Sequence, residues 1–122
     1  MDYKTFQSTI FGIFALLFII ASGHHLYEYF YPYLRPNYPE IRHLALVFIN
    51  LFMSAMMVKR HKCFLPFLLL VVVQQIYGHG LSLYQNFSHS TSILHTDIVI
   101  IVLMPILLVT YTYDVLRPIK KP

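Results

Sequence analysis

Four long apolar stretches restrict what this sequence can fold into. They cover residues 6–31, 41–58, 64–84 and 93–113. A helix that crosses a bilayer needs roughly 17–25 mostly apolar residues, and each stretch is long enough. Backbone polar groups in hydrocarbon must be hydrogen-bonded within the chain, which favours helices, and 122 residues are too few for a transmembrane barrel. The sequence therefore predicts an all-α protein, a bundle of four transmembrane helices forming a single membrane domain over residues 1–122.

The composition supports a membrane protein and excludes several other classes. Hydrophobic residues make up 57% of the chain and charged residues 11%, whereas soluble domains carry about 25% charged residues. Disordered proteins have the opposite composition. The single cysteine excludes an intramolecular disulfide framework and a Cys-rich zinc site. The basic residues flank the apolar stretches, so we expect the lipid bilayer and other membrane subunits as partners, and no nucleic acid.

The distribution of the basic residues predicts the orientation. With an even number of spans, seven of the nine lysines and arginines lie on the side that carries both termini, and the other two are Arg35 and Arg42. Cytoplasmic loops are enriched in lysine and arginine. We therefore expect both termini in the cytoplasm and a multi-pass protein of the bacterial inner membrane or an equivalent organelle membrane. One alternative remains, because Lys4, the first apolar stretch and Ala21-Ser22-Gly23 resemble a cleavable secretory signal, whose removal would leave three spans.

Histidines and acidic residues gather toward the side opposite the termini. Six of the seven histidines fall there, and an ionisable residue at membrane depth is costly enough to indicate a function. Imidazole and carboxylate groups can bind zinc, copper or iron, and histidines can be axial haem ligands; a quinone or a proton relay is equally compatible. The candidate cofactor-binding residues are His24, His25, His43, His79 and His95. The candidate metal ligands are His25, Glu28, His79, His95 and Asp97.

A polar stripe follows the third apolar stretch. Gln75, His79 and Ser82 are separated by four and three residues, so they share one helix face. Polar side chains avoid lipid, and we expect this stripe to face the bundle or a partner protein. The alternative reading is structural: histidines at the bilayer interface and amides that hydrogen-bond between helices require no ligand.

The sequence carries no motif of an enzyme. It has no HExxH pair, no phosphate-binding loop and no dinucleotide-binding glycine pattern. The connections between the stretches are too short to form a catalytic domain. The sequence therefore favours an accessory or structural subunit of a larger membrane complex, with a haem-, metal- or quinone-binding protein as the alternative; an enzyme is less favoured, and no particular cofactor is indicated.

The end of the first stretch resembles one known family. The run Ala21-Ser22-Gly23-His24-His25-Leu26 places small residues before polar or basic ones, and the chain has four spans in about the right length. In these features it is similar to the small four-helix membrane proteins of the DoxX type. The resemblance implies an accessory role near respiratory or thiol-redox systems. The second stretch lacks the glycine and acidic residue of that pattern, and one cysteine carries no thiol-redox pair.

Overall fold

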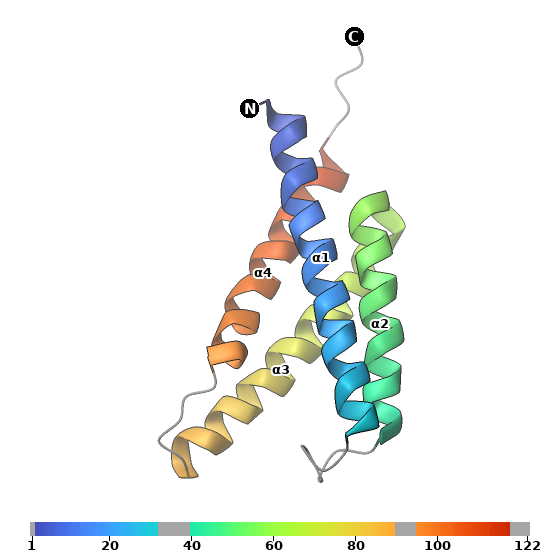
Figure 1. The fold of residues 1–122 in the computed structure, drawn as a ribbon. Helices are drawn as coiled ribbons and strands as arrows, with labels where there is room; N and C mark the ends of the chain where they lie inside the picture. The colour runs from blue at the N-terminus through green and yellow to red at the C-terminus, as the bar shows by residue number, and fades with distance from the viewer. Residues whose placement is uncertain (1, 32–39, 90–94, 118–122) are drawn as a thin grey trace. The chain divides into compact units, whose positions relative to one another are not determined.

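In the computed structural model, which describes residues 2–31, 40–89 and 95–117, the chain is helical (Figure 1). The helices are α1 (Tyr3–Phe30), α2 (Glu40–Lys59), the short 3-10 helix η2 (Lys62–Phe64), α3 (Leu65–His89) and α4 (His95–Leu116). Within this described part, four helices are long and apolar enough to cross a membrane. The prediction of an all-α protein with four such helices is confirmed.

Helix ends differ from the predicted boundaries for local reasons. Helix α1 begins at Tyr3, earlier than expected, because the Asp2 side chain accepts a hydrogen bond from the Thr5 backbone N–H at 2.7 Å and caps the helix. That hydrogen bond also holds the pKa of the Asp2 carboxyl below its usual value. Helix α3 continues to His89, beyond the predicted end at residue 84. Residues 81–89 contain neither proline nor glycine to end the helix.

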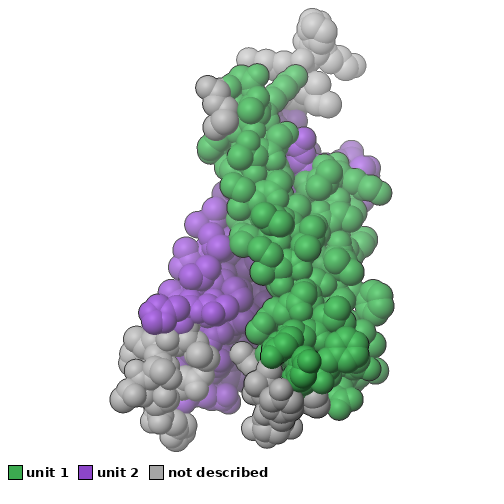
Figure 2. Space-filling view, in the orientation of Figure 1, with its two compact units in different colours: residues 1–59 green, residues 60–122 purple. Residues whose placement is uncertain are grey.

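The chain forms two compact units, which Figure 2 colours separately. The first unit, Met1–Lys59, contains α1 packed against α2. The second unit, Arg60–Pro122, contains α3 packed against α4, with η2 contacting both. Arg60, at the start of the second unit, has a left-handed backbone with φ of 51°, a conformation common just after a helix end. The polar residues of interest lie within these two hairpins.

In the first unit, the buried face of α2 repeats with a coiled-coil period. His43, Val47, Asn50, Ser54 and Met57 are all buried, at successive spacings of four, three, four and three residues. This period is typical of helices that cross at a shallow angle. On α1, the Ser22 hydroxyl donates to the Val47 carbonyl at 3.2 Å. A small residue therefore allows the two backbones to come close at this point.

In the second unit, Tyr111 of α4 contacts His61 and Phe64, which directly precede α3. Its side chain is fully buried, and its hydroxyl donates to the His61 carbonyl at 2.9 Å. The Phe64 ring meets the Tyr111 ring edge-on, with 5.6 Å between centroids. Arg60 lies 3.9 Å from the Asp114 carboxylate. These contacts fix the end of α4 against the start of α3, which sets the register of the hairpin.

Candidate functional site

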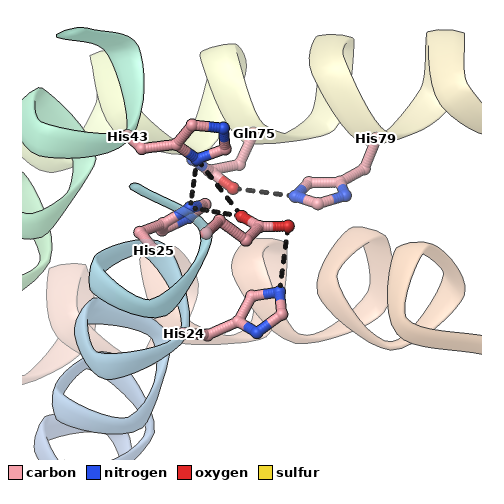
Figure 3. Close-up of polar contacts among 6 residues, drawn as sticks. His24, His25, His43, Gln75 and His79 are labelled. Carbon is pink, nitrogen blue, oxygen red and sulfur yellow. Dashed lines mark hydrogen bonds and ion pairs between the residues drawn. The ribbon is translucent and has the colours of Figure 1, made fainter. Parts of the chain in front are cut away.

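The first unit brings a carboxylate together with three histidines. Residues three and four apart share a helix face, so His24 and His25 both reach Glu28 on α1. The α1–α2 hairpin then places His43, near the start of α2, beside the end of α1. Figure 3 shows the three imidazole rings directed toward one carboxylate. We call His25, Glu28 and His43 the His–Glu cluster.

Three atoms of the His–Glu cluster form a nearly equilateral triangle. The Nδ1 atoms of His25 and His43 are 3.4 Å apart, and each lies 3.2 Å from Oε2 of Glu28. For zinc with nitrogen and oxygen ligands at about 2.0–2.1 Å, a tetrahedral arrangement separates neighbouring ligand atoms by about 3.3–3.4 Å. The triangle therefore has the dimensions of one face of a zinc tetrahedron.

The surroundings of the cluster favour a bound cation. The Glu28 and His43 side chains are 6% and 7% exposed, whereas that of His25 is 25% exposed. A buried carboxylate is costly unless it is paired. Glu28 uses its second oxygen, Oε1, to contact Nε2 of the more exposed His24 at 3.4 Å. His24 is therefore placed to support the carboxylate while Oε2 remains directed at the two Nδ1 atoms.

The donor set also limits which metal ions or cofactors the cluster suits. Two imidazoles and one carboxylate are the protein ligands of one class of catalytic zinc site, and they also form the triad of non-haem Fe(II) sites with open coordination positions. A haem would have to lie between two axial imidazoles, with one ring on each of its faces. Here both Nδ1 atoms face the same carboxylate oxygen, Oε2 of Glu28, at 3.2 Å. The cluster fits a single ion better than a macrocycle.

The second unit contains a separate group of polar contacts, which we call the α3–α4 network. Nδ1 of His79 lies 2.5 Å from Oδ1 of Asp97 on α4, and Nε2 of His79 lies 3.0 Å from Oε1 of Gln75. The Ser82 hydroxyl donates to Oδ2 of Asp97 at 2.9 Å. The contact between Gln75 and His79 is drawn in Figure 3. The polar stripe of α3 thus meets an acidic residue of α4.

The structure places the candidate residues in two groups. His24, His25 and Glu28 meet His43, a residue in the candidate cofactor set but not in the candidate metal set. His79 and Asp97 bind each other, so a metal at His79 would have to displace Asp97 or Gln75 from the ring. His95 is exposed at the first residue of α4. The signal for His43 lay in the repeat of the buried face of α2, which His43 shares with Val47.

Comparison with known proteins identifies no relative of this chain. No protein-family model matches the chain, and neither curated proteins nor solved structures give a significant match. The DoxX-type layout therefore stays a prediction.

Proposed function

We propose that this is a small multi-pass membrane protein that binds one transition-metal ion through His25, Glu28 and His43. The observation that carries the proposal is the triangle of two Nδ1 atoms and one carboxylate oxygen, with sides of 3.2, 3.2 and 3.4 Å. Zinc or ferrous iron suits this donor set. The protein supplies three ligands, which leaves at least one coordination position for water or another ligand.

The four apolar helices support a location in a membrane. The distribution of the lysines and arginines along the chain supports one orientation of the helices across it. With both termini in the cytoplasm of a bacterium, or the equivalent compartment of an organelle, the C-terminal end of α1 and the start of α2 lie at the opposite face. The His–Glu cluster then lies near the outer surface of the membrane. A metal ion could reach it from that side without crossing the hydrocarbon core.

A titration of the metal-stripped protein in detergent tests the proposal. We expect Co²⁺ to bind at one equivalent per chain, with the visible bands of a tetrahedral or five-coordinate ion, and Zn²⁺ to displace it. The variant His25→Ala should lose this binding, because it removes one corner of the triangle. His95→Ala is the matched control, since His95 is exposed on α4. Cobalt binding that survives in His25→Ala would contradict the assignment.

A second function is favoured by how little of the chain lies outside the helices. The segment between α1 and α2 spans residues 31–39, too short for a domain of its own. Many large apolar side chains are exposed along the helices, such as Leu70 on α3 and Val109 on α4, which are both 69% exposed. Such surfaces suit lipid or the helices of another subunit, as in an accessory subunit of a larger membrane complex, and the DoxX-type layout agrees with that role. Purification in mild detergent followed by mass spectrometry tests it: a second protein in fixed ratio supports the role, and a lone chain argues against it.

A further inference from the structure

The hydrogen count of the α3–α4 network follows from the orientation of its glutamine amides. Both ring nitrogens of His79 face oxygen atoms, Oδ1 of Asp97 at 2.5 Å and Oε1 of Gln75 at 3.0 Å. An amide oxygen can only accept a hydrogen bond, so the contact with Gln75 requires a hydrogen on Nε2. The nitrogen of that amide donates to Oε1 of Gln74 at 2.8 Å, which agrees with its oxygen facing His79.

The contact between His79 and Asp97 requires a second hydrogen. With Nε2 protonated, a neutral ring leaves a lone pair on Nδ1 directed at the carboxylate, and two lone pairs at 2.5 Å repel each other. One additional proton on the Nδ1–Oδ1 line removes this repulsion. The proton can reside on the ring, which gives an ion pair, or on the carboxyl group, which gives a neutral pair. In both cases the pair carries no net charge.

The burial of Asp97 adds an energetic reason for that proton. Asp97 is 6% exposed in a helix apolar enough to cross a membrane. A carboxylate there is costly unless it is neutralised. The Ser82 hydroxyl already donates to Oδ2, so the carboxyl group has a partner on each oxygen once the proton is present.

We propose that His79 and Asp97 form a proton-binding site that links α3 to α4, with the proton as its ligand. Asp97 is the ionisable residue of α4 that contacts His79. The other ionisable side chains of α4 are His95, exposed at its start, and Tyr111, Tyr113 and Asp114 near its end. Lys62 of η2 is separated from His79 by about 25 Å along the helix, at about 1.5 Å per residue. The site is independent of the metal proposal, which rests on the other unit.

Nitrogen-15 NMR of the full chain, labelled at histidine and held in a detergent micelle or nanodisc, tests this site. An ordinary imidazole has a pKa of about 6.5 and is mostly neutral at about pH 8. At that pH we expect His79 to show a hydrogen on Nε2 and a second one shared between Nδ1 and Asp97. His95, which is exposed, serves as the internal reference for an imidazole in contact with solvent.

Two variants make the test decisive. Asp97→Asn should remove the shared hydrogen, while His79→Asn assigns the signal. A bare Nε2 in the wild type, which both glutamine amides in the reverse orientation would give, overturns the proposal, as does an unchanged His79 signal in Asp97→Asn.

If Asp97→Asn does not fold, Ser82→Ala takes its place, because the Ser82 hydroxyl donates to Oδ2 of the same carboxyl group. Losing that hydrogen bond should shift the signal of the shared hydrogen, and an unchanged signal would then count against the site.

Discussion

Replacing Glu28 with glutamine should weaken Co²⁺ and Zn²⁺ binding by more than about 100-fold, because losing even a group that only supports a metal ligand costs about 10–100-fold. Glutamine has nearly the same shape as glutamate, so the helix should remain intact. It lacks the negative charge that balances the ion, and Oε2 lies 3.2 Å from both Nδ1 atoms that would share it. Competition against a chromogenic chelator measures the affinities.

The same measurement on two further variants gives a graded series. His24→Ala should lower the affinity by about 10–100-fold, because His24 contacts Oε1 of Glu28, the carboxylate oxygen that does not face the two Nδ1 atoms. Glu40→Gln is the matched control, since Glu40 is an exposed acidic residue at the start of α2, and it should leave the affinity unchanged. Equal affinities for Glu28→Gln and Glu40→Gln would remove the His–Glu cluster as the metal site.

Replacing Ser22 with leucine should separate α1 from α2. Ser22 is 5% exposed, and its hydroxyl lies 3.2 Å from the Val47 carbonyl, which leaves no room for a larger side chain. Overpacking of this kind typically costs about 1–3 kcal/mol of unfolding free energy. The variant should also bind metal poorly, because Ser22 lies about one turn before His25. Unfolding in mixed micelles with increasing SDS, followed by circular dichroism, measures the first effect.

The neighbouring residue provides the control for this variant. Gly23 is exposed, and a Cβ atom placed on it meets nothing within 4 Å. Gly23→Leu should therefore leave the α1–α2 hairpin stable and its metal binding unchanged. If Ser22→Leu and Gly23→Leu behave alike, the contact between α1 and α2 at this level does not hold the hairpin together.

The sequence predicted the helices well because their signal is local. Length and hydropathy are enough to find four apolar helices in 122 residues. The helix ends were less accurate, since α1 begins where the Asp2 side chain caps it, and α3 runs on through polar residues that do not break a helix. These ends depend on single side chains, which a count of apolar residues does not register.

The contacts between helices were harder to predict. Helical spacing brings His25 to Glu28, but the contact of Glu28 with His43 depends on how α1 and α2 align in the hairpin. The pairing of His79 with Asp97 likewise depends on the alignment of α3 with α4. The repeat through His43, Val47 and Asn50 marks the buried face of α2, and this signal favours including His43, a candidate cofactor-binding residue, among the candidate metal ligands as well.

For the membrane protein proposed above, the separation of the polar contacts into two hairpins has a consequence for insertion. Glu28 finds its histidine partners within the first hairpin, and Asp97 finds His79 within the second. A helix pair that neutralises its own acidic residues lowers the free energy of moving them out of water, and it needs no contact with the rest of the chain to do so. During synthesis, the first hairpin can therefore insert and settle before the second has left the ribosome.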